Sequence, residues 1–91
     1  SVVVPTSHHH KVAKLFLTEH KHVLLEKPLT RSVEEANDLI HTAKENNLIL
    51  QVGHLERFNP VVKAITQLID YPRFIECIRV SPYKPRVTDI N

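Results

Sequence analysis

The residues of this sequence best suited to chemistry centre on Lys27, which directly follows an apolar run and stands between Glu26 and Pro28. Pro28 disfavours helix at Lys27 and makes a cis peptide bond accessible before it. An ammonium group held there could hydrogen-bond a substrate hydroxyl and stabilise the negative charge that develops on its oxygen as hydride leaves. The alternative is a surface lysine paired with a neighbouring glutamate, and three residues alone leave both interpretations open.

Short apolar runs alternate with segments of helical periodicity along the chain. The pattern predicts strands at residues 2–4, 22–25, 48–52 and 74–80, and helices at residues 8–19, 33–45 and 60–69. Such alternation is typical of a parallel sheet with right-handed crossovers and helices on its faces. The last strand mixes Glu76 and Arg79 among apolar residues, so we expect it to begin a second, antiparallel sheet with one wetter face.

Residues at the expected helix starts support these assignments. Ser32 and Glu35 have the spacing of a capping box. Asn59 followed by Pro60 combines a favoured N-cap with a favoured first helical residue. Ser7 is the expected N-cap of the first helix.

Ligands of parallel sheets bind beyond the carboxyl ends of the strands. Three segments directly follow a predicted strand, namely residues 5–7, 26–28 and 53–54. We therefore expect the functional site where these segments meet. The only glycine is Gly53, so these 91 residues do not contain the glycine-rich turn that holds the diphosphate of a dinucleotide.

The composition excludes several function classes. The formal charge is +2, and lysines and arginines are scattered among acids, which argues against a nucleic-acid partner. Apolar runs fall short of the ~20 residues of a membrane-spanning helix, which argues against a membrane partner. Cys77 is the only cysteine and suits a reducing, cytoplasmic compartment.

Three consecutive histidines, His8, His9 and His10, suggest a metal site at first sight. Adjacent helical residues point about 100° apart, so the three rings cannot converge on one ion, and we expect no metal. His54 differs because it follows Gly53 at a strand end. We interpret His54 as a residue that lines the site rather than as the general base.

Three blocks of residues are most informative when they are taken together. Residues 4–9 (Val-Pro-Thr-Ser-His-His), 21–29 (Lys-His-Val-Leu-Leu-Glu-Lys-Pro-Leu) and 53–60 (Gly-His-Leu-Glu-Arg-Phe-Asn-Pro) resemble consecutive blocks of the Gfo/Idh/MocA oxidoreductases in order and separation. The resemblance covers essentially the whole chain. It implies the C-terminal half of a Rossmann-type parallel sheet with flanking helices in residues 1–71. Residues 72–91 would begin a second, α+β substrate domain.

The resemblance also implies an enzyme that transfers a hydride between NAD or NADP and a ring hydroxyl carbon of a sugar or nucleotide sugar. Lys27 would be catalytic and would bind the substrate, and Glu26 would lie near the nicotinamide ribose. The expected cofactor-binding residues are Pro5, Thr6, His9, Glu26, Lys27, Pro28, His54 and Arg57. These residues do not distinguish NAD from NADP.

The chain departs from the family pattern in two ways. His20 stands where a glycine usually ends the helix in left-handed geometry, which is costlier for histidine. The glycine-rich turn and the Asp/His motif that carries the general base are not among these 91 residues. We therefore expect an internal piece of the enzyme that is inactive alone, and its unpaired sheet edge favours self-association into a homo-oligomer.

The C-terminal residues look like the branch of the family that acts on UDP-N-acetylglucosamine. In that branch Arg79 and Arg86 would be partners for the diphosphate of a nucleotide sugar. The two arginines could equally be solvated residues of the second sheet.

A non-catalytic α/β binding or assembly module is the alternative to an enzyme. The small size and the missing glycine-rich turn favour it. Binding of NAD or NADP would separate the two hypotheses.

Overall fold

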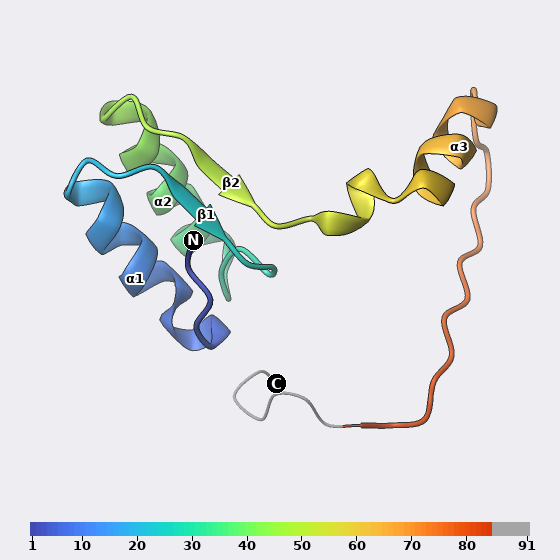
Figure 1. Cartoon of the computed structure of the whole chain (residues 1–91), viewed down its shortest axis with the longest axis horizontal. Coiled ribbons are helices and arrows are strands. Elements are labelled where there is room, and N and C mark those ends of the chain that lie inside the picture. Colours follow the sequence, from blue (N-terminus) through green and yellow to red (C-terminus); the bar gives the residue numbers. More distant parts are fainter. Residues whose placement is uncertain (85–91) are drawn as a thin grey trace. The chain divides into compact units, whose positions relative to one another are not determined.

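The chain folds as two compact units, which are described here from a computed structural model over residues 1–84. The first unit runs from Ser1 to His54, and the second begins at Leu55. The first unit contains α1 (Thr6–Thr18), β1 (Val23–Leu25), α2 (Val33–Glu45) and β2 (Leu50–Val52), and the second contains the 3-10 helix η1 (Leu55–Phe58) and α3 (Pro60–Leu68). Figure 1 labels all of them except η1. The two compact units do not test the boundary between a dinucleotide-binding and a substrate domain that we expect at residue 71, so that boundary stays a prediction.

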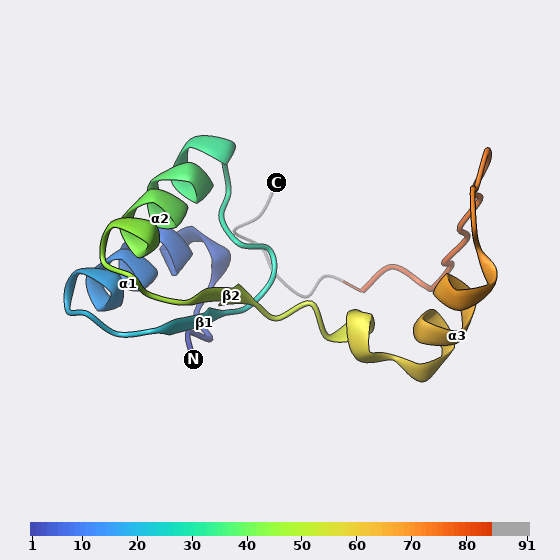
Figure 2. The same cartoon turned by 90° about the horizontal axis from the view of Figure 1, so that it is seen from above.

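The first unit contains the parallel sheet that the alternating pattern predicts. β1 and β2 are parallel, with Leu25 opposite Val52. On the other side of β1, Val2 forms a parallel bridge to Leu25. Helices α1 and α2 lie side by side on one face of the paired strands, as Figure 2 shows. The expected α/β fold of Rossmann type is therefore confirmed.

Burial follows the two periodicities that define the elements. In β1, Val23 and Leu25 are buried while Leu24 is 48% exposed, because successive strand residues point to opposite faces. Leu17 of α1 and Leu39 of α2 are fully buried against this sheet face. The core of the unit consists of Val2, Ala13, Leu17, Val23, Leu25, Leu39 and Ala43.

Two helices begin at the predicted caps. The Ser32 hydroxyl accepts a hydrogen bond from the Glu35 N–H at 3.2 Å. The Glu35 carboxylate accepts from the N–H of Arg31 at 3.2 Å, one residue before the usual partner in a capping box. The Asn59 side chain accepts from the Val61 N–H at 2.9 Å, so both caps are confirmed.

The predicted cap of α1 is wrong. The helix begins at Thr6, with Pro5 in the N-cap position and no side-chain cap, so Ser7 lies inside the first turn. Pro5 enters with φ −54° and ψ 146°, and its carbonyl accepts a hydrogen bond from the His8 N–H at 2.9 Å. The ring of Pro5 fixes its φ near the value of a helix, so Pro5 can precede the first turn without a side-chain cap. It occupies the position that we expected for Ser7.

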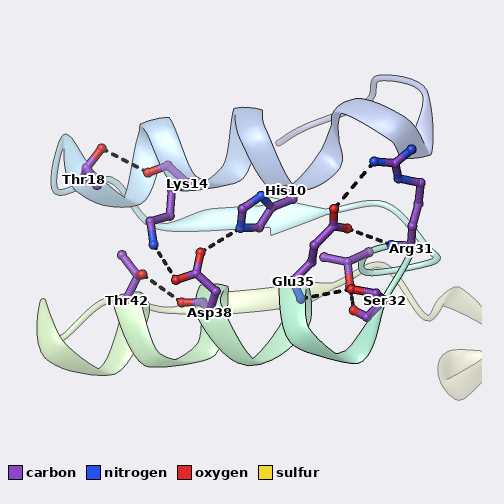
Figure 3. A network of polar contacts seen from close by, with 9 residues as sticks. His10, Lys14, Thr18, Arg31, Ser32, Glu35, Asp38 and Thr42 are labelled. Carbon is purple, nitrogen blue, oxygen red and sulfur yellow. Dashed lines mark hydrogen bonds and ion pairs between the residues drawn. The ribbon is translucent and has the colours of Figure 1, made fainter.

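A carboxylate on α2 joins the two helices. Asp38 accepts hydrogen bonds from Lys14 at 2.6 Å and from His10 at 2.7 Å, both on α1 (Figure 3). The hydrogen bond from Lys14, and then that from His10, lowers the pKa of Asp38. Nearby, a hydrogen bond from its own backbone N–H, and then one from the Ser32 hydroxyl, lowers the pKa of Glu34.

The predicted strand at residues 74–80 is not formed. The structure has neither helix nor strand over residues 69–84. A strand forms only when another strand completes its hydrogen bonds, and no strand of the described residues pairs with this segment. Cys77 in this segment is an exposed free thiol. Over residues 1–84, no helix is long and apolar enough to cross a membrane.

Candidate functional site

The register of the sheet brings the three predicted segments to one edge. Val2, Leu25 and Val52 lie opposite one another on three adjacent parallel segments. The residues that follow them therefore leave the sheet at the same carboxyl edge. The Glu26 N–H donates to the Val2 carbonyl at 3.3 Å, and the Gly53 N–H donates to the Leu25 carbonyl at 2.8 Å. Glu26 and Lys27 thus follow the central one of the three segments, which has a parallel neighbour on each side.

Gly53 makes room for the carboxylate of Glu26. A methyl group built on Gly53 would lie 3.0 Å from Oε1, 3.4 Å from Cδ and 3.6 Å from Oε2 of Glu26. The φ angle of Gly53 is not in the left-handed region, so its backbone does not require glycine. A side chain at this position would therefore crowd the carboxylate of Glu26, whereas the backbone conformation would accept it.

Lys27 is exposed at the end of β1 and is followed by a cis peptide bond to Pro28. Within residues 1–84, none of the ion pairs involves Lys27, so the pairing with a neighbouring glutamate is not observed. Glu26 beside it is partly buried. At this edge of the sheet the side chain of Lys27 is therefore exposed to solvent, whereas that of Glu26 is partly covered by neighbouring residues.

The side chain of His9 is buried in contact with the backbone. Its ring is 2% exposed, Nδ1 lies 2.8 Å from the Pro28 carbonyl and Nε2 lies 2.9 Å from the Val4 carbonyl. Both ring nitrogens are therefore occupied by the protein backbone. The ring joins the first strand end to the Glu-Lys-Pro turn.

The other two histidines of the run also differ from one another. His8 is exposed, and His10 bonds to Asp38. In residues 1–84 no group of three His, Cys, Asp or Glu side chains is placed to hold a metal ion. Three adjacent helical residues thus occupy three different environments, as their angular separation predicts.

The remaining predicted site residues fall into three groups. Pro5 is exposed and Thr6 is buried at the start of α1, and His54 is exposed directly after Gly53, so all three lie in segments at the sheet edge. Arg57 lies in η1, within the second unit. Arg79 is exposed in the segment without regular structure, and Arg86 lies outside the described residues.

Two features of the site were not anticipated. One is the contact of Gly53 with Glu26; its signal was available, since Gly53 is the only glycine of the chain and stands at a strand end. The other is the contact of each His9 ring nitrogen with a backbone carbonyl. No local pattern gives a signal for it, because the two carbonyls belong to residues five and nineteen positions away.

A family model described as an oxidoreductase family with an NAD-binding Rossmann fold, GFO_IDH_MocA, matches residues 1–54. The matched residues are those of the first unit, from Ser1 to His54. The match includes the three segments that converge at the sheet edge.

Individual relatives agree with this match. The UDP-N-acetylglucosamine 3-dehydrogenase of Acidithiobacillus ferrooxidans is 41% identical over 92 aligned residues, which cover 100% of this chain and 29% of that protein. The scyllo-inositol 2-dehydrogenase (NAD(+)) of Bacillus subtilis is 36% identical over 69 residues, 76% of this chain and 20% of that protein. A solved structure of the A. ferrooxidans protein has a TM-score of 0.69 at 41% identity, over 72% of this chain and 22% of that one. The chain thus spans less than a third of the length of these relatives.

Proposed function

Because this chain belongs to the Gfo/Idh/MocA oxidoreductase family with its NAD-binding Rossmann fold, we propose that it is part of a sugar or nucleotide-sugar dehydrogenase that uses NAD or NADP. One observation carries the proposal: three strand-end segments converge at one edge of a parallel sheet, with Glu26 and Lys27 on the central one. Ligands of such sheets bind at this edge. The residues at the edge are polar and of both charges, as a site for a ribose and a reacting hydroxyl requires.

Lys27 is the proposed catalytic residue of this chain. Oxidation of a carbinol removes a hydride from carbon and a proton from oxygen, so negative charge builds on the oxygen as the hydride leaves. An ammonium group that hydrogen-bonds this oxygen stabilises that charge and orients the hydroxyl. Lys27 is exposed and makes no ion pair within residues 1–84, which leaves its ammonium available for a substrate.

The residues around Lys27 fit the nicotinamide half of a dinucleotide. The bound nicotinamide supplies the hydride acceptor. The carboxylate of Glu26 can accept hydrogen bonds from ribose hydroxyls, while Pro5 and Thr6 on one side and His54 on the other border the same edge. Pro28 shapes the turn after Lys27. The general base, and the turn that holds the diphosphate, come from parts of the protein outside these 91 residues.

We propose a nucleotide sugar, UDP-N-acetylglucosamine, as the substrate. Support comes from the relative of that activity, to which this chain is 41% identical over its whole length. Arg79 and Arg86 are the proposed partners of the substrate diphosphate, because guanidinium groups bind phosphates in bidentate fashion. Arg57 is proposed to act at the nicotinamide end.

The proposed enzyme is a cytoplasmic homo-oligomer of which this chain is an internal piece. The free thiol of Cys77 is compatible with a reducing compartment. The strands of the first unit leave open edges that further strands or a second copy can cover. By this proposal, the 91 residues alone neither bind a dinucleotide well nor turn over a sugar.

The test is a comparison of two lysine variants of the complete protein encoded by the gene. NAD and NADP are each titrated against the protein, and oxidation of UDP-N-acetylglucosamine is followed at the absorbance of the reduced nicotinamide. Lys27→Met should lower kcat by about 10²- to 10³-fold, the range for loss of one donor to the transition state. Lys44→Met is the control, since Lys44 is exposed in the last turn of α2.

Each result has a distinct meaning. Binding of neither dinucleotide would favour a non-catalytic α/β module and overturn the proposal. Turnover by Lys27→Met equal to that of the Lys44→Met control would remove Lys27 from the reaction. Turnover of another sugar, with UDP-N-acetylglucosamine inert, would replace only the proposed substrate.

A further inference from the structure

His9 lies between two of the segments that form the proposed site. Its ring is 2% exposed, with Nδ1 2.8 Å from the Pro28 carbonyl oxygen and Nε2 2.9 Å from the Val4 carbonyl oxygen. Val4 immediately precedes the first strand-end segment, and Pro28 closes the Glu-Lys-Pro turn. One side chain therefore connects two loops. The hydrogen bonds of the sheet hold each of these loops only where it leaves its strand.

The chemistry of the two partners defines what the ring contributes. A carbonyl oxygen only accepts hydrogen bonds, so the ring of His9 donates an N–H to at least one of the two carbonyls and packs its other nitrogen against the second. With both nitrogens engaged, the ring has no polar atom left for a ligand. The ring nitrogens of His9 thus engage the backbone of the site rather than a cofactor or a sugar.

The helix that carries His9 gives the ring a fixed base. The buried residues of α1 are Thr6, His9, Ala13 and Leu17, which follow one another at three- and four-residue spacing along one face. Ala13 and Leu17 belong to the core beneath the sheet. The ring is therefore held by packing of the helix as well as by its own hydrogen bonds.

We propose that His9 is a positioning residue, which holds the Glu-Lys-Pro turn so that the ammonium of Lys27 meets the substrate hydroxyl. The proposal rests on the proposed function for its catalytic consequence, but the connection between His9 and the turn stands on geometry alone. It assigns to His9 a role distinct from direct cofactor binding.

The first measurement addresses the connection without any variant. In the complete protein with ¹⁵N-labelled histidine, a ring N–H of His9 should be observed and should exchange with water far more slowly than the ring of His41. His41 is a suitable reference because its side chain is 70% exposed on α2. Exchange of the His9 ring N–H as fast as that of His41 would overturn the proposal even if the protein had no oxidoreductase activity.

The second measurement addresses catalysis. His9→Gln cannot place a nitrogen against each of the two carbonyls, so the turn should shift, and kcat should fall by about 10-fold or more, since a misplacement of 1 Å can cost about 10²-fold in rate. The KM for the dinucleotide should change by less than about threefold, and His41→Gln should match the wild type. The ¹³C signal of the Pro28 carbonyl should move in His9→Gln and stay in His41→Gln.

The outcomes separate the two proposals. A raised dinucleotide KM with kcat unchanged in folded His9→Gln would make His9 a ligand group and overturn the positioning role. No turnover by the wild type would refute the proposed function, whereas the ring exchange and the Pro28 carbonyl signal would still decide the role of His9.

Discussion

Replacing Gly53 by alanine should impair cofactor binding while leaving the fold intact. The new methyl group would lie 3.0 Å from Oε1 and 3.4 Å from Cδ of Glu26, so the neighbouring group must give by a few tenths of an ångström. The group in the way is the end of a flexible side chain rather than backbone. The carboxylate should therefore move and the sheet should not.

The expected effect on stability is small. The φ angle of Gly53 is outside the left-handed region, so alanine meets no backbone strain there. Alanine also restricts the unfolded chain, which favours the folded state by about 0.4–1 kcal/mol and offsets the crowding. The free energy of unfolding should change by less than about 1 kcal/mol.

The expected effect on binding is larger. The displaced carboxylate should lose one hydrogen bond to the ribose, worth about 0.5–1.5 kcal/mol, which corresponds to about 2- to 10-fold in affinity. We expect the Kd of the dinucleotide to rise by that factor in Gly53→Ala of the complete protein, measured by fluorescence titration. Gln51→Ala is the matched control, since Gln51 is exposed on β2 two residues earlier.

A double-mutant cycle shows whether the effect passes through Glu26. In a Glu26→Ala background, the added Gly53→Ala substitution should change the Kd by less than twofold, because the carboxylate that it displaces is gone. An unchanged Kd in Gly53→Ala alone, or an equal loss in both backgrounds, would refute the reasoning.

Three further predictions concern stability and can be checked by urea unfolding of the protein. Asp38→Asn should lower the free energy of unfolding by up to about 1 kcal/mol, because it removes the ion pair with Lys14. Solvent screening limits the effect, since both side chains of the pair are more than a third exposed. The wild type should lose this advantage only in acid. The folded state lowers the pKa of Asp38 from its ordinary 3.8, so the stabilisation is complete above that value and is lost as the pH falls through the lower, folded pKa; a difference that persisted in strong acid would contradict this account. His20→Gly should stabilise the protein by about 1 kcal/mol, because His20 has φ 56° in a region that costs an L-residue about 1–2 kcal/mol; Asn47→Gly at φ 53° should gain less, since asparagine tolerates this region, and equal gains would argue against the explanation. Leu39→Ala should cost about 2–5 kcal/mol, because Leu39 is fully buried; a loss below 1 kcal/mol would mean that the core is not packed as described.

The sequence alone determined the features that depend on neighbours a few residues apart. Ser32 caps the start of α2 and Asn59 caps the start of α3, because their side chains bond N–H groups within three residues, a spacing that a local pattern contains. The parallel order of the strands followed from alternating periodicities. Once the strands are parallel, the meeting of Glu26 and Gly53 at one edge follows from the order of the segments.

Only the tertiary structure decided what these segments do to one another. Nothing in the sequence indicated that the ring of His9 lies between two backbone carbonyls, because both carbonyls come from elsewhere in the chain. Gly53 was visible as a solitary glycine, but its reason, the carboxylate of Glu26, comes from the adjacent strand. The pattern at residues 74–80 did not become a strand, because the hydrogen bonds of a sheet need a partner that no local pattern supplies. Local hydrogen bonds can be predicted from spacing, whereas contacts between distant residues exist only once the chain has folded.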